Sequence, residues 1–195
     1  MNNRIENNKR IAKNTAMLYM RMLLSMAVSF YTSRIVLNIL GVDDFGIYNL
    51  VGGIVVLFSF LNNAMASSTQ RFLNFELGRE NIDEVKRIFS MSLTTHLSIA
   101  FVVLVLSETV GLWFLNAYMN LPADRMNAAN WVYQLSVLSC CIQIMRIPYQ
   151  SSIIAYERMS FYAYISIVEV LLKLLIILFL FLSDFDKLIY YSILS

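Results

Sequence analysis

Long apolar stretches alternate with short polar ones along almost the whole chain. A helix needs about 20 mostly apolar residues to cross the roughly 30 Å hydrocarbon core of a bilayer. Five stretches are this long and a sixth begins near the end: residues 17–37, 47–66, 88–114, 129–147, 161–182 and 188–195. The pattern therefore predicts an all-α integral membrane protein, a multi-span helical bundle in which residues 1–195 form one transmembrane unit.

The polar segments between these stretches contain residues that end helices. Gly41, followed by Asp43 and Asp44, predicts a tight hairpin between the first two spans. Residues 71–87 form a long charged segment and predict a partly helical second turn. Pro122 predicts a break between the third and fourth spans, and the fourth turn is expected to follow Pro148.

Composition supports a membrane protein, and the placement of charge predicts its orientation. Hydrophobic residues make up 58% of the chain and charged residues 14%, too apolar a balance for a soluble domain of this size. The N-terminus with the second and fourth turns holds ten basic residues, whereas the other side holds only Arg125 and Lys187. The ten are Arg4, Lys9, Arg10, Lys13, Arg71, Arg79, Lys86, Arg87, Arg146 and Arg158. Because Lys and Arg accumulate in cytoplasmic loops, the N-terminus is expected in the cytoplasm.

Polar residues inside the apolar stretches repeat at helical spacing. At 100° per residue, those of the first span lie within about 40° of one another. The predicted stripes are Asn14, Arg21, Ser25 and Thr32; Asn63 and Arg71; Gln143 and Arg146; and Glu169 and Lys173. Even on the lowest insertion scales, placing an Arg near the bilayer centre costs about 2.5 to 3.5 kcal/mol of free energy. Because facing lipid is this unfavourable, the stripes should face one another. They predict a cationic, hydrophilic cavity that attracts an anion.

Other interpretations of these residues stay open. Arg21 and Arg146 could extend to the headgroups, and Glu169 and Lys173 could neutralise each other as a packing contact. Arg34 lies on nearly the opposite face from Arg21 and is expected to reach the outer headgroups. His96 could relay protons or form a hydrogen bond between helices.

The residues give little support for an enzyme. The sequence shows no set of nucleophile, general base and orienting residue, no His and Cys spacing typical of a metal site, and no glycine-rich loop for phosphate. Cys140 and Cys141 are adjacent, which is poor geometry for a disulfide, and are expected to be small packing residues. We therefore expect no catalysis, no metal, no cofactor and no nucleic-acid partner.

Three motifs stand out: an Arg early in the first helix, "SRIVLNILGVDDFGIY" from Ser33 to Tyr48, and "SSTQRF" from Ser67 to Phe72. They resemble motifs of bacterial polysaccharide flippases, which translocate lipid-linked oligosaccharides and belong to the MATE-like multidrug, oligosaccharidyl-lipid and polysaccharide superfamily. The resemblance continues through "RIPYQSSIIAYERMSFYAYISIVEVLLKL" and covers nearly the whole chain.

The resemblance implies the N-terminal lobe of a two-lobe transporter whose central cationic cavity opens alternately to each side of the bacterial inner membrane. The implied cargo is an oligosaccharide repeat unit on undecaprenyl pyrophosphate, used for O-antigen, capsule or exopolysaccharide synthesis. Arg21 matches the family's cavity arginine and Arg71 the basic end of the second helix, while Arg146 and Lys173 are further candidates for the pyrophosphate. The expected partners are the lipid bilayer, a polysaccharide polymerase and glycosyltransferases.

The chain departs from the family in ending inside the sixth stretch, so the C-terminal lobe is expected to be absent and the chain alone should not complete a transport cycle. Two alternatives remain. A multidrug or cation antiporter of the same fold should have a cavity dominated by acidic residues, whereas basic residues outnumber them here. A non-transporting scaffold for glycosyltransferases would use the polar stripes as helix contacts without an open cavity.

Overall fold

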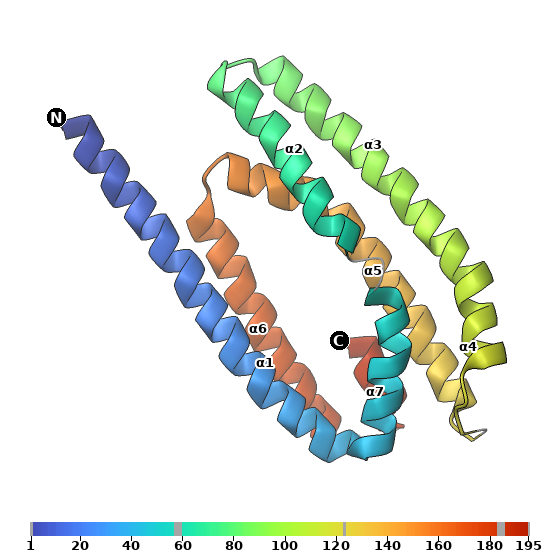
Figure 1. The fold of residues 1–195 in the computed structure, drawn as a ribbon. Coiled ribbons are helices and arrows are strands. Elements are labelled where there is room, and N and C mark those ends of the chain that lie inside the picture. The colour runs from blue at the N-terminus through green and yellow to red at the C-terminus, as the bar shows by residue number, and fades with distance from the viewer. Residues whose placement is uncertain (1, 57–59, 123, 183–185, 195) are drawn as a thin grey trace.

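The computed structural model describes residues 2–56, 60–122, 124–182 and 186–194, and all regular structure in these ranges is helical (Figure 1). The elements are α1 (Asn2–Val56), α2 (Phe60–Gly78), α3 (Ile82–Leu106), the π-helical turn η2 (Ser107–Gly111), α4 (Leu112–Tyr118), α5 (Met126–Ala155), α6 (Met159–Leu182) and α7 (Lys187–Leu194). The predicted all-α class is confirmed for this part of the chain. Residues 57–59 of the second predicted span, and Ser195 of the sixth, lie outside the described residues.

The helices run back and forth between two ends of the molecule. The N-terminus, the α2–α3 turn and the α5–α6 turn lie toward one end, and the bend in α1, the segment before α5 and the start of α7 lie toward the other (Figure 1). Helix α1 packs along α6, and α2 packs against α3. Helix α5 contacts α1, α2, α3, α6 and α7, so it is the central element of the bundle.

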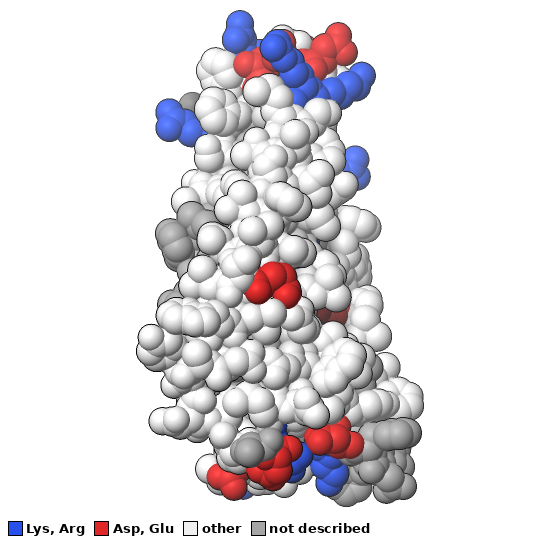
Figure 2. All heavy atoms as spheres, turned by 90° about the vertical axis from the view of Figure 1, so that its right-hand side faces the viewer, with Lys and Arg blue, Asp and Glu red and all other residues white. Residues whose placement is uncertain are grey.

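Three helical segments are long and apolar enough to cross a membrane: Asn14–Val55, Ile82–Tyr118 and Met159–Ile177. Figure 2 shows most charged residues gathered at the two ends of the molecule, with a nearly uncharged face between them. The predicted span 129–147 lies within α5, which is not among the three. Its polar side chains lower its hydropathy, and its neighbours bury much of its surface. Arg4, Arg10 and Lys13, which support the predicted orientation, have side chains outside those that the structure describes.

Gly41 bends α1 into two arms, as its position in the sequence predicts. Its φ is 78°, in the left-handed region that side chains with a Cβ rarely adopt. The arm after the bend starts with Asp43 and Asp44, and Asp44 is buried. The predicted tight hairpin between the first two helical arms is thus confirmed.

The fourth turn does come after Pro148, but the expected end of the fourth span at residue 147 is wrong. Helix α5 continues through this buried proline to Ala155, and the turn lies at residues 156–158. A proline removes one helical hydrogen bond, but neighbouring helices can hold the next turn in place. Ser151 Oγ donates to the Ala66 carbonyl oxygen of α2 (3.2 Å), and Gln150 Nε2 donates to Tyr162 Oη of α6 (2.6 Å).

Most of the charged segment 71–87 is helical, as predicted. Helix α2 extends to Gly78 and α3 begins at Ile82, which leaves only residues 79–81 as the turn. The Asn81 side chain accepts a hydrogen bond from the backbone N–H of Glu84 (3.4 Å) and so caps α3.

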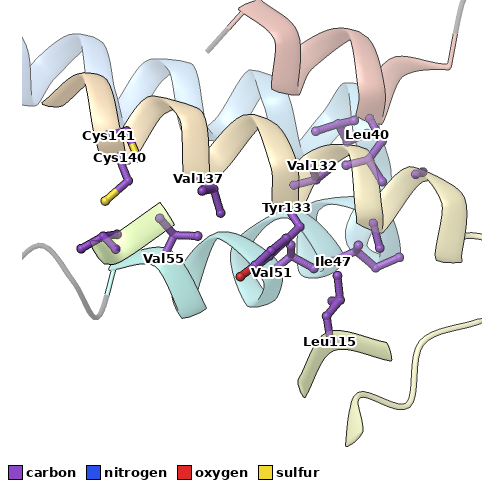
Figure 3. Packing of buried hydrophobic residues seen from close by; sticks show 14 of the residues in the cluster. Leu40, Ile47, Val51, Val55, Leu115, Val132, Tyr133, Val137, Cys140 and Cys141 are labelled. Atoms are coloured by element: carbon purple, nitrogen blue, oxygen red, sulfur yellow. The ribbon is translucent and has the colours of Figure 1, made fainter. Parts of the chain in front are cut away.

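The apolar core lies where the second arm of α1 meets α5 and the α3–α4 region (Figure 3). Tyr133 is fully buried in it and donates its hydroxyl to the Ser107 carbonyl oxygen (2.8 Å), which lies in the π-helical turn η2. A π-helical turn interrupts the regular backbone pattern, and here a side chain supplies a partner to one of its carbonyls. Cys140 and Cys141 are free and buried in this core, which confirms their predicted packing role.

We expect Arg125→Gln to lower the free energy of unfolding by about 1 to 2 kcal/mol. The Arg125 guanidinium lies 3.1 Å from Asp44 Oδ2 and 3.1 Å from Asp186 Oδ2, so it joins the α1 bend to the segment before α7. Asp44 is buried and would lose its cation, whereas the Asp186 side chain is partly solvated. Thermal unfolding of the detergent-solubilised protein measures the change.

The matched control for this variant is Lys86→Gln. Lys86 Nζ lies 3.6 Å from Asp83 Oδ1, but both side chains are well exposed, and such pairs contribute little to stability. The control should unfold as the wild type does. Equal unfolding temperatures for the wild type and both variants would show that Arg125 does not hold these elements together.

Candidate functional site

A cavity of about 330 Å³ lies between the first arm of α1, α5, α6 and α7, and three basic side chains line it. These are Arg21, Arg146 and Lys173, accompanied by a single carboxylate, Glu169, among the described lining residues. Ser25 and Thr32 also line the cavity. The stripes predicted on the first, fourth and fifth spans therefore face a shared space.

Arg21 lies against an aromatic ring of α6. Its guanidinium carbon is 4.2 Å from the ring centroid of Tyr162, within the range of a cation–π interaction. This contact turns the Arg21 side chain toward α6 and the cavity. Tyr162 itself was not predicted as a site residue, although it precedes Ser166 and Glu169 by four and seven residues and so shares their helix face.

Glu169 lies between the other two cations. Its Oε2 is 3.8 Å from Arg146 Nη1, and its Oε1 is 3.5 Å from Lys173 Nζ. All three side chains are about half exposed, because they open onto the cavity. Solvated ion pairs at these distances are weak, so the group is available to a bound anion.

Two neighbouring cavities extend this polar interior. One, of about 520 Å³ between α2, α5 and α6, is lined by Asn63, Gln143 and Gln150 and shares Arg146, Glu169 and Lys173 with the first. The other, of about 350 Å³ between the second arm of α1 and α5, shares Gln143 with the second cavity and has uncharged lining residues, including Asn49, Ser136 and Ser192. The described part of the chain thus has three neighbouring cavities that share lining residues, two of them lined by charged side chains and one by neutral ones.

Two polar atoms in these linings are buried and lack a hydrogen-bond partner among the described residues. They are Thr32 Oγ1 in the first cavity and Asn62 Oδ1 in the second. Buried polar atoms are normally paired.

The structure brings together eight of the ten predicted site residues and leaves two apart. The eight that line the cavities are Arg21, Ser25, Thr32, Asn63, Gln143, Arg146, Glu169 and Lys173. Asn14 and Arg71 line none of the three described cavities, and Arg71 is exposed on α2. Arg71 is five residues beyond Ala66, the last α2 residue that lines any of the three cavities, and lies nearer the charged end of the helix.

Two further polar residues of the apolar helices lie outside these cavities. His96 is buried, with Nδ1 2.6 Å from the Ser92 carbonyl oxygen, and Ser92 Oγ lies 3.0 Å from Thr69 Oγ1 of α2. Both partners of His96 Nδ1 lie on its own helix, and its buried Nε2 has no hydrogen-bond partner among the described residues, so the described contacts do not include the expected hydrogen bond from His96 to another helix. Glu108 accepts a hydrogen bond from Gln134 Nε2 of α5 (3.1 Å).

Comparison with known proteins adds no identification. No protein-family model matches the chain, and no curated protein and no solved structure matches it. The findings support an all-helical protein with three candidate membrane-spanning helices. The resemblance to polysaccharide flippases rests on the sequence motifs alone.

Proposed function

We propose that this chain binds undecaprenyl-pyrophosphate-linked oligosaccharide repeat units and takes part in moving them across the bacterial inner membrane by alternating access. The observation that carries the proposal is the cluster of Arg21, Arg146 and Lys173 around one cavity, with Glu169 as its single described carboxylate. Helices long and apolar enough to cross a membrane contribute to the same cavity. Such a cavity attracts an anion into an otherwise apolar environment.

Pyrophosphate suits this cavity better than a monovalent anion does. Arginine holds phosphate oxygens through paired, charge-assisted hydrogen bonds, and lysine adds a further point charge. Arg146 and Lys173 also line the neighbouring cavity of α2, where amide groups can bind the hydroxyls of an attached sugar. The proposed cargo therefore combines an anionic group for the cationic region with neutral polar groups for the rest.

The same geometry weighs against the two alternatives. A cation antiporter needs acidic groups free to hold its substrate, whereas Glu169 is already close to two basic side chains. A scaffold would close its polar stripes into helix contacts, whereas the described stripes open onto cavities of about 330 to 520 Å³.

Ligand binding to the chain in nanodiscs tests the proposal. The ligand is a prenyl-pyrophosphate disaccharide, and the comparison ligands are the matching uncharged prenyl alcohol and the lipophilic cation tetraphenylphosphonium. We expect binding of the pyrophosphate lipid well above that of the alcohol. A preference for tetraphenylphosphonium would support the antiporter, and equally weak binding of all three would support the scaffold.

We expect Arg21→Ala to weaken binding of the pyrophosphate lipid by about tenfold, the effect of losing one charged hydrogen-bonding group. The matched control is Arg34→Ala, on the same helix but exposed and outside the described cavity linings. Titration of both variants in nanodiscs measures the difference. Unchanged binding by Arg21→Ala, or equal loss in the control, would remove Arg21 from the site.

A further inference from the structure

Glu169 is the one acidic side chain among the described residues of all three cavities. It lies on α6 one turn before Lys173 and reaches Arg146 on α5, so a single carboxylate faces two cations from two helices. If the cavity served only to bind an anion, a carboxylate at this place would oppose that binding. Its position therefore calls for a role of its own.

Both of its ion pairs are loose. The closest oxygen to Arg146 Nη1 is at 3.8 Å, beyond hydrogen-bond distance, and the closest to Lys173 Nζ is at 3.5 Å. The Glu169 side chain is 41% exposed, so water can solvate it when it leaves its partners. A carboxylate held this weakly is easily replaced by an anion with more charge and more acceptor oxygens.

We propose that Glu169 is an internal competitor for the cargo: it occupies Arg146 and Lys173 when the cavity is empty and is displaced by the anionic group that binds there. This inference rests on the proposed function, since it names the residue that sets the strength of that same site. In the empty cavity Glu169 limits the repulsion between the two cations. On release it returns to them and lowers the cost of letting the anion go.

Replacing Glu169 with the isosteric Gln tests this role, with inorganic pyrophosphate as the probe. Calorimetric titration of the chain in phosphatidylcholine nanodiscs should show pyrophosphate binding about three- to tenfold tighter in Glu169→Gln than in the wild type. Stopped-flow dissociation of the probe should be slower by a similar factor. Unchanged or weaker binding by the variant would overturn the proposal.

Glu108→Gln is the matched control. Glu108 also belongs to a candidate membrane span, but it accepts a hydrogen bond from Gln134 and lines none of the described cavities. Its variant should bind pyrophosphate as the wild type does. An equal gain in both variants would show an effect of overall charge and would contradict a specific role for Glu169.

A double-mutant cycle separates competition from simple repulsion of the probe. If Glu169 acts by occupying Lys173, the gain from Glu169→Gln should shrink by at least half when Lys173 is already replaced with Gln. A gain of the same size in both backgrounds would mean that Glu169 acts through space alone, against our proposal.

The same titrations distinguish this inference from the proposed function. A folded wild-type chain that binds no pyrophosphate would overturn both. A different result separates the two: the wild type binds pyrophosphate, Arg21→Ala weakens this binding, and Glu169→Gln leaves it unchanged. That result would overturn the competitor role and leave the proposed function standing.

Discussion

Charge reversal in Arg146→Glu should weaken binding of a pyrophosphate lipid by about a hundredfold, equivalent to about 2.7 kcal/mol. Arg146 lines both cavities that contain charged residues, and the change leaves Arg21 and Lys173 facing two carboxylates. The charge of the described lining falls from two positive units to none. The new carboxylate would lie near Glu169, so the two negative charges together would repel a bound anion.

Arg158→Glu is the control for this prediction, because it makes the same change in net charge at the exposed α5–α6 turn. Binding isotherms of both variants in nanodiscs, at two salt concentrations, separate local from screened effects. We expect loss of binding only in Arg146→Glu. Equal losses in the two variants would show that the anion responds to the overall charge of the protein instead of to this cavity.

The second large effect concerns stability: we expect Gly111→Ala to lower the free energy of unfolding by about 3 kcal/mol, at the upper end for an overpacked core. A Cβ at Gly111 would overlap the Tyr133 hydroxyl and crowd its ring. Tyr133 is fully buried and its hydroxyl is hydrogen-bonded to the Ser107 carbonyl oxygen, so the ring cannot move aside at low cost.

A buried thiol of the core provides the measurement, in a background where Cys140, which lines the neutral cavity, is replaced with Ala. Cys141 is free, buried and outside the linings of the three cavities, so a thiol-reactive fluorescent dye reports its exposure as the protein unfolds. Gly53→Ala is the control, because a Cβ there meets no atom within 4 Å. Adding Tyr133→Phe to Gly111→Ala should restore part of the stability, since it removes the atom that overlaps most. Unfolding of Gly111→Ala at the wild-type temperature would contradict this account of the η2–α5 contact.

Sequence periodicity could predict which residues share the cavity, because the 100° spacing of a helix fixes the face of each side chain. Arg21, Ser25 and Thr32 lie on one such face and meet the face of Glu169 and Lys173. The bend at Gly41 could be predicted as well, because a sharp bend with a positive φ favours glycine, the residue without a Cβ.

Features that depend on contacts between helices could not be predicted in this way. Proline usually ends a helix, but bonds from Gln150 and Ser151 to α6 and α2 let α5 continue past Pro148. Tyr48 lines both the cationic and the neutral cavities, which its position near the end of an apolar stretch does not predict. Arg71 lies in a stretch that only resembles a flippase motif, and five residues separate it from Ala66, the last α2 residue of the cavity linings.

We infer that the polar stripes face water inside the bundle, and the accessibility of engineered thiols is a direct test of this. In a background with Cys140 and Cys141 replaced by Ala, single cysteines are placed at Ser25, Gln143 and Phe30, and membrane vesicles are treated with a water-soluble thiol reagent. Ser25 and Gln143 line the cavities, whereas Phe30 is exposed on the same candidate span as Ser25 and lines none of those described. We predict that Ser25→Cys and Gln143→Cys react and that Phe30→Cys does not. If neither Ser25→Cys nor Gln143→Cys reacts, in variants that fold normally, the stripes do not face water and the proposed cavity is wrong.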